Sequence, residues 1–192
     1  TIVSYNIHHG NPPAKPGVID LDAIANVLAN EKPDFVALQE VDVNINRSGN
    51  VNQAEYLAKK LNMYFYFAKA IDHDGGDYGV AVLSKYPISE QHSLKFSRIE
   101  GLKAEDRVLA VVSVKLGNGK KITFGSTHLD HQKDEALRLL QVSEIVKYAE
   151  NEKGAFIVAG DFNAVPSSAT IQLLDKSFIR TCDNCGFTIP VV

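Results

Sequence analysis

The sequence contains no tryptophan, and no run of apolar residues is long enough to span a bilayer. It therefore offers no argument for insertion into a membrane. Internal repeats, low-complexity tracts and charge blocks are also absent, so nothing marks a linker between domains. With 192 residues, 45% of them hydrophobic, we expect one domain over residues 1–192 with a substantial core, and we expect it to be a monomer.

An excess of positive charge is absent as well. The 20 basic and 23 acidic residues give a formal net charge of −3. Such a chain has no broad basic field to hold a long polyanion, because phosphate contacts dominate the affinity for nucleic acid. Binding to nucleic acid must therefore be local or absent.

Cysteine is scarce, and both copies lie near the end as Cys182-Asp-Asn-Cys185. No second Cys or His pair follows at zinc spacing, so we expect a structural or incidental role, with a redox or zinc site as the alternative. A cysteine pair is compatible with an oxidising compartment. The first residues already read as a strand, and we expect a secreted or periplasmic protein whose leader has been removed.

Apolar periodicity predicts alternating strands and helices. Residues 88–106 are weakly patterned, and the acidic, glycine-rich segment 72–77 reads as a solvated loop near the site. The predicted strands are 1–6, 35–40, 63–70, 78–84, 107–116, 121–127, a strand ending near Asp161, and 187–192; the predicted helices are 21–32, 52–61, 132–151 and 168–175.

Polar side chains stand where four of these strands end: Asn6, Glu40, His128, and Asp161 with Asn163. Each alone is ordinarily a turn former or a solvated strand end. A strand–helix–strand order makes consecutive strands parallel, so their ends emerge at one edge of a sheet and can converge.

Carboxylate and amide oxygens suit a hard cation such as Mg²⁺, which keeps water ligands for a phosphate substrate. We assign Glu40 to this ion, with Mn²⁺ as a possible substitute, and we expect Asn6 to donate amide hydrogen bonds to the substrate phosphate. Asp161 would orient or deprotonate an attacking water, while His128 and Asn163 would donate hydrogen bonds to phosphoryl oxygens.

Five segments in this order resemble the endonuclease/exonuclease/phosphatase superfamily. They are Tyr5-Asn6-Ile7, Leu38-Gln39-Glu40-Val41, Tyr78-Gly79-Val80-Ala81-Val82-Leu83-Ser84, Ser126-Thr127-His128-Leu129 and Gly160-Asp161-Phe162-Asn163. The resemblance covers nearly the whole chain. It implies an α/β (α+β) fold, a four-layer α/β/β/α sandwich of two packed mixed β-sheets flanked by helices. It also implies Mg²⁺-dependent hydrolysis of a phosphoester.

The same resemblance implies metal binding by Glu40 with help from Asn6, and a site completed by His128, Asp161 and Asn163. Arg107 resembles an arginine that contacts substrate phosphate in deoxyribonucleases. The alternative for Arg107 is a surface arginine in a hairpin.

Two motifs of the family pattern do not occur within the 192 residues. Family members continue with a strand that bears an aspartate and with a Ser-Asp-His segment, and His131 and Asp183 do not match either motif. We therefore expect the last strands to be missing and the 192 residues alone to be weakly active or inactive.

Three hypotheses of function follow. The first is a metal-dependent phosphoester hydrolase, either a phosphodiesterase, a phosphatase or a nuclease. The second is a catalytically silent binding module on the same fold, and the third is the cysteine-based redox or zinc protein. Small molecules, lipid head groups and nucleic acid all remain open as carriers of the phosphoester.

Overall fold

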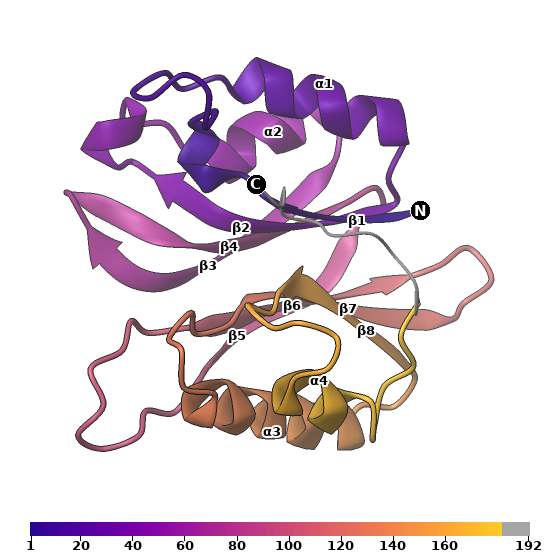
Figure 1. Ribbon diagram of the computed structural model, residues 1–192. Helices are drawn as coiled ribbons and strands as arrows, with labels where there is room; N and C mark the ends of the chain where they lie inside the picture. The colour runs from indigo at the N-terminus through magenta and orange to yellow at the C-terminus, as the bar shows by residue number, and fades with distance from the viewer. Residues whose placement is uncertain (182–192) are drawn as a thin grey trace.

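The computed structural model describes residues 1–181, which form two β-sheets packed face to face between two layers of helices (Figure 1). The predicted four-layer α/β/β/α sandwich is thereby confirmed. Cys182, Asp183, Cys185 and the predicted strand at 187–192 lie outside the described residues.

The first sheet has the strand order β1-β2-β4-β3. Strand β1 pairs with β2 in parallel, and β4 runs antiparallel to β2 and β3. Helices α1 and α2 cover its outer face (Figure 1). The elements of this half are β1 (Ile2–Asn6), 3₁₀ helix η1 (His8–Gly10), α1 (Leu21–Glu31), β2 (Phe35–Val43), 3₁₀ helix η2 (Asn46–Ser48), α2 (Gln53–Leu61), β3 (Tyr64–His73) and β4 (Gly76–Ser84).

The second sheet has the order β5-β6-β7-β8, and its outer face is covered by α3 and α4 (Figure 1). Here the parallel pair is β7 and β8, which α3 connects. Each sheet thus contains one parallel strand pair joined through a helix. The elements are β5 (Ile88–Lys95), β6 (Val108–Lys115), β7 (Lys121–His128), α3 (Ala136–Glu150), β8 (Ala155–Asp161) and α4 (Ala169–Leu174).

Three apolar layers hold the sandwich together. Leu28 and Leu38 pack between α1 and the first sheet, and Val142 packs between α3 and the second sheet. Between the sheets, the rings of Phe35 and Phe124 stack with centroids 5.0 Å apart. Burial of one such side chain stabilises the fold by about 1.5–3 kcal/mol, so these layers fix how the sheets face each other.

Side-chain caps begin the first two long helices where the sequence predicts them. The Asp20 carboxylate accepts from the Ala23 backbone N–H at 2.9 Å, and Asn52 accepts from Glu55 at 3.1 Å. Each cap satisfies a backbone donor that the first turn of a helix leaves unpaired. Among residues 1–181, no helix has the length and apolar character needed to cross a bilayer.

The structure differs from the prediction most clearly at β2, at β5, at the β3–β4 turn and at the start of α3. Strand β2 does not end at Glu40 but continues to Val43, because a bulge between Leu38 and Val41 lets the pairing with β4 resume. Residues 88–95 form strand β5, whose residues are nearly all exposed and so lack the alternation typical of a half-buried strand.

The segment 72–77 is not a loop, because β3 and β4 form a tight hairpin through Asp74 and Gly75. Helix α3 begins at Ala136 rather than Gln132. The carboxylate of Asp130 accepts from the Gln132 backbone at 2.9 Å and holds that residue in a turn.

Gly160 allows β8 to lie close to β7. A Cβ at this position would lie 2.1 Å from the Thr127 carbonyl oxygen, whereas a Cβ at Gly117, in the turn between β6 and β7, meets nothing within 4 Å. We predict that Gly160→Ala lowers the free energy of unfolding by about 3 kcal/mol. Gly117→Ala should change it by less than about 0.5 kcal/mol.

Guanidinium denaturation of both variants tests this prediction. Equal stability of the two variants would show that β8 can shift away from β7 at little cost.

Candidate active site

Strands β1 and β2 bring Asn6 and Glu40 together. Their parallel register sets Asn6 opposite Gln39, so Asn6, the last residue of β1, lies beside Glu40. Glu40 occupies the β2 bulge with φ of +57°, a conformation uncommon for a residue with a Cβ. Because a bulge redirects the side chains of its strand, Glu40 reaches the edge of the sheet from the middle of β2.

Strands β7 and β8 bring His128 and Asp161 together in the second sheet. These residues are register partners and end their strands, as predicted. His128 Nε2 lies 3.8 Å from Asp161 Oδ2. Beyond β8, the Asn163 backbone N–H donates to Asp161 Oδ1 at 3.0 Å, and the Asn163 side-chain amide donates to the Leu129 carbonyl at 3.0 Å.

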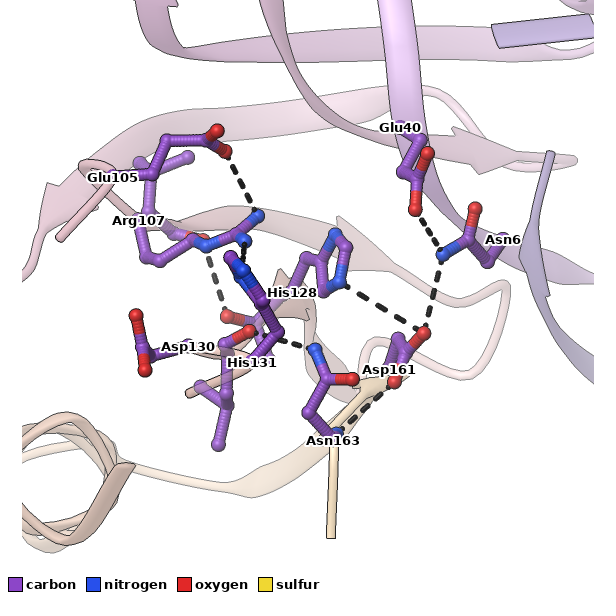
Figure 2. Close-up of polar contacts among 12 residues, drawn as sticks. Asn6, Glu40, Glu105, Arg107, His128, Asp130, His131, Asp161 and Asn163 are labelled. Carbon is purple, nitrogen blue, oxygen red and sulfur yellow. Dashed lines mark hydrogen bonds and ion pairs between the residues drawn. The ribbon is translucent and has the colours of Figure 1, made fainter. Parts of the chain in front are cut away.

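The amide of Asn6 connects the two sheets (Figure 2). Its Nδ2 donates to Glu40 Oε1 at 2.7 Å and to Asp161 Oδ2 at 3.1 Å. Its Oδ1 accepts from the His8 backbone N–H at 3.0 Å, which fixes the direction of the amide. Asn6 therefore turns its nitrogen, rather than its carbonyl oxygen, toward the carboxylates.

Arg107 and Tyr78 line a small cavity between the sheets together with His128. Arg107 is only 5% exposed, so the alternative of a surface arginine is wrong. Its guanidinium lies 3.2 Å from Glu105 Oε1 and 3.2 Å from His131 Nδ1 (Figure 2). The cavity is thus lined by a buried guanidinium that is ion-paired with Glu105.

Tyr78 and Glu105 are site residues that the sequence analysis did not select. Tyr78 reads as the start of a buried strand, and nothing local to it indicates a functional hydroxyl. Burial, with the negative charge of Glu40, raises the pKa of Tyr78. Its hydroxyl therefore stays protonated at neutral pH and can donate a hydrogen bond.

His128 is neutral at pH 7. Burial and the positive charge of Arg107 lower the pKa of His128 to about 4, although the nearby carboxylates of Asp161 and Glu40 act in the opposite direction. Its Nδ1 is buried without a hydrogen-bond partner. Such an atom is costly to leave unpaired, which indicates that a ligand or water completes it.

Asp130 does not join the cluster. It is fully buried, and its carboxylate is engaged with the Gln132 backbone. Figure 2 shows Asp130 apart from Asp161, with His131 between them. His131 lies beside the Arg107 guanidinium and also contributes to lowering the pKa of His128.

The donor atoms at the Asn6 junction suit a hard divalent cation. Glu40 and Asp161 place one carboxylate oxygen each within hydrogen-bond distance of a single nitrogen. Two carboxylates this close repel each other unless positive charge lies nearby, and oxygen donors are those that Mg²⁺ and Mn²⁺ prefer. The residues present therefore fit a metal ion of this class.

Comparison with known proteins identifies the family of the chain. Residues 3–190 match the model of the Endonuclease/Exonuclease/phosphatase family. The chain is also similar to the uncharacterized protein YbhP of Escherichia coli strain K12. The two are 28% identical over 205 residues, covering 99% of this chain and 79% of YbhP.

Two solved structures share the fold. An endonuclease/exonuclease/phosphatase from Beutenbergia cavernae superposes with a TM-score of 0.69 at 23% identity, covering 87% of this chain and 48% of that chain. ANGEL2, a 2′,3′-cyclic phosphatase, superposes with a TM-score of 0.68 at 20% identity, covering 91% of this chain and 56% of its own.

The low pKa of His128 predicts a loss of stability in acid. An unfolded histidine titrates near 6.5 and His128 in the folded protein near 4, so between these values the unfolded chain binds more protons. The contribution of His128 to the free energy of unfolding is therefore fully present above about pH 6.5. In metal-free protein, this titration should lower the free energy of unfolding by on the order of 3 kcal/mol as the pH falls to 4.

Guanidinium denaturation in EDTA between pH 7 and pH 4 measures this effect. The free energy of unfolding should depend less on pH in His128→Asn than in the unchanged protein. His92 is an exposed histidine of β5, and His92→Asn should keep the full pH dependence. An unchanged slope in His128→Asn would contradict a neutral, buried His128.

Proposed function

Because the chain belongs to the endonuclease/exonuclease/phosphatase family, a family of phosphoester hydrolases, we propose that it hydrolyses phosphodiester bonds with the help of Mg²⁺. One observation carries the proposal. A single amide nitrogen, Asn6 Nδ2, contacts carboxylates from both sheets, at 2.7 Å for Glu40 and 3.1 Å for Asp161. Two groups able to serve one phosphoryl centre therefore stand side by side.

Glu40 is the residue that would hold the ion, and Asn6 would assist it. With its carbonyl oxygen bonded to the His8 backbone, Asn6 orients the Glu40 carboxylate through its nitrogen. Rotation of this amide would be needed for Asn6 to act as an oxygen ligand. When bound, Mg²⁺ or Mn²⁺ neutralises charge on phosphoryl oxygens and makes phosphorus easier to attack.

Asp161 is the proposed general base. One carboxylate oxygen accepts from Asn6 and the other accepts from the Asn163 backbone, which together fix its orientation. A carboxylate held in this way can accept a proton from a water aligned with phosphorus. Asn163 adds an amide at the same edge of the site.

His128, Tyr78 and Arg107 form the side that would receive the phosphoryl oxygens. His128 is neutral and so carries one N–H and one lone pair, Tyr78 keeps its hydroxyl proton, and the Arg107 guanidinium supplies further N–H donors. These donors lie around one cavity. Developing negative charge on phosphorus would be stabilised there by groups already in place.

The substrate class follows from charge. With a net charge of −3 the chain lacks a field for long nucleic acid. The proposed substrates are therefore phosphoesters recognised locally at the phosphate, whether in a small molecule, a lipid head group or a short nucleic acid. That ANGEL2 is a 2′,3′-cyclic phosphatase supports a phosphoester substrate at this general level.

For the full-length gene product, we predict Mg²⁺-dependent hydrolysis of bis-p-nitrophenyl phosphate that EDTA abolishes. Asp161→Asn preserves the shape of the side chain but removes the base, and should lower kcat by about 100-fold or more. Glu40→Gln should lower turnover similarly and weaken Mg²⁺ binding. Steady-state kinetics across a Mg²⁺ titration measures both.

Glu31→Gln, at the exposed end of α1, is the matched control and should behave like the unchanged protein. Hydrolysis that survives EDTA, or that both site variants retain, would rule out the proposed mechanism. Binding of phosphodiesters without turnover would favour the silent binding module instead.

Arg107 generates a separate prediction about substrate affinity. Lysine keeps the charge but loses the planar guanidinium with several donors. Arg107→Lys should therefore raise KM about tenfold with a smaller change in kcat. Arg98 is an exposed arginine paired with Asp106, and Arg98→Lys is the control. Equal KM values in the two variants would show that Arg107 does not contribute to substrate binding.

A further inference from the structure

A second group of metal-binding side chains lies at Glu40. After β1, the 3₁₀ helix η1 carries His8 and His9, and one ligand atom from each of His8, His9 and Glu40 lies within 4.8 Å of the others. We propose that these three side chains form a binding position for a divalent transition metal such as Zn²⁺ or Co²⁺. This inference rests on the proposed function only in that the two metal positions share Glu40.

The backbone of η1 brings the two imidazoles together. In an extended chain, consecutive side chains point in opposite directions. Here His8 and His9 both adopt φ of +45°, and their ring centroids lie 4.3 Å apart. Left-handed conformations are costly for residues other than glycine and gather at functional sites. Glu40, the third member, also has a positive φ.

The tautomer of His8 suits metal binding. Its Nδ1 lies 3.0 Å from the Asn11 carbonyl oxygen, which can only accept a hydrogen bond. The proton therefore resides on Nδ1, and Nε2 keeps a free lone pair. Asn11 is itself fixed, because its amide donates to the Val18 carbonyl at 2.7 Å. This is the arrangement in which a backbone carbonyl orients a ligating histidine.

Gln53 fixes the distance between η1 and the β2 bulge. This fully buried side chain donates to the His9 carbonyl at 2.7 Å and accepts from the Asp42 backbone N–H at 3.0 Å. The Ile7 backbone N–H also donates to the Gln39 carbonyl at 3.1 Å. Both sides of the cluster are thus anchored before any ion binds.

The positive charge of Arg47 near the cluster is offset by a carboxylate and so does not exclude a cation. Arg47 lies close enough to act electrostatically on His9, but its guanidinium is bonded to both oxygens of the buried Asp42 carboxylate at 2.9 Å and 2.8 Å. The Asp42 charge offsets that of Arg47. Asp42 is engaged by this pair, so Glu40 supplies the carboxylate of the cluster.

The donor set decides which ion binds. Two imidazole nitrogens and one carboxylate suit zinc, cobalt, nickel or copper, whereas Mg²⁺ demands oxygen ligands in near-octahedral geometry. The nitrogen-containing position should therefore discriminate against Mg²⁺. Glu40 would then belong to two metal positions. Asn6 and Asp161 accompany it at the Mg²⁺ position, and His8 and His9 accompany it at the transition-metal position.

Metal titration of tag-free protein tests the proposal. Asparagine tolerates a positive φ, so the double variant His8→Asn/His9→Asn removes both imidazoles while keeping the backbone conformation. Calorimetry and the visible absorption of bound Co²⁺ should show a loss of affinity of at least about tenfold. The loss of affinity for Mg²⁺ in the same double variant should be much smaller than the loss for Co²⁺. His92→Asn, an exposed histidine of the other sheet, should bind Co²⁺ normally.

Unchanged Co²⁺ binding in the double variant would overturn the proposal, as would equal losses for Co²⁺ and Mg²⁺. Asp161→Asn separates this inference from the proposed function. It should abolish hydrolysis yet retain Co²⁺ binding. If no phosphodiester is hydrolysed but Co²⁺ binding still depends on His8 and His9, the proposed function fails and the metal position stands.

Discussion

The hydrogen bonds of one amide, that of Asn6, join the two halves of the candidate site. Asn6 ends β1 in the first sheet, and Asp161 ends β8 in the second. The 3.1 Å bond between their side chains therefore crosses the sandwich. It can form only because the apolar layer around Phe35 and Phe124 sets the sheets face to face with these strand ends in contact.

This geometry separates the carboxylates that could hold a metal ion from the hydrogen-bond donors of the site. The carboxylates of Glu40 and Asp161 lie together, and Arg107 lies across the cavity with Tyr78 and His128. A metal-bound phosphate would place its cation against the carboxylates and its anionic oxygens against the donors. Burial lowers the pKa of His128, so the ring stays neutral at pH 7 and can donate a hydrogen bond to a phosphoryl oxygen without adding a charge to the site.

The family resemblance implied the four layers, and the predicted strand ends indicated that Asn6, His128 and Asp161 converge, which they do as the last residues of strands in parallel pairs. Glu40 was also predicted at the site, but as a strand end, whereas it lies in a bulge inside β2 that the continuous apolar run does not reveal. Tyr78 was missed because its role depends on the opposite sheet. Strand β5 was missed because its exposed residues carry no apolar alternation.

The central claim is that Glu40 and Asp161 serve one phosphoryl group around one hard ion. Anomalous diffraction from crystals grown with Mn²⁺ and inorganic phosphate tests it most directly. The account predicts an Mn²⁺ peak about 2.1 Å from a Glu40 oxygen. The phosphate should lie between this ion and the side chains of Asp161 and His128. An ion bound away from Glu40, or a phosphate that does not approach Asp161, would contradict the account.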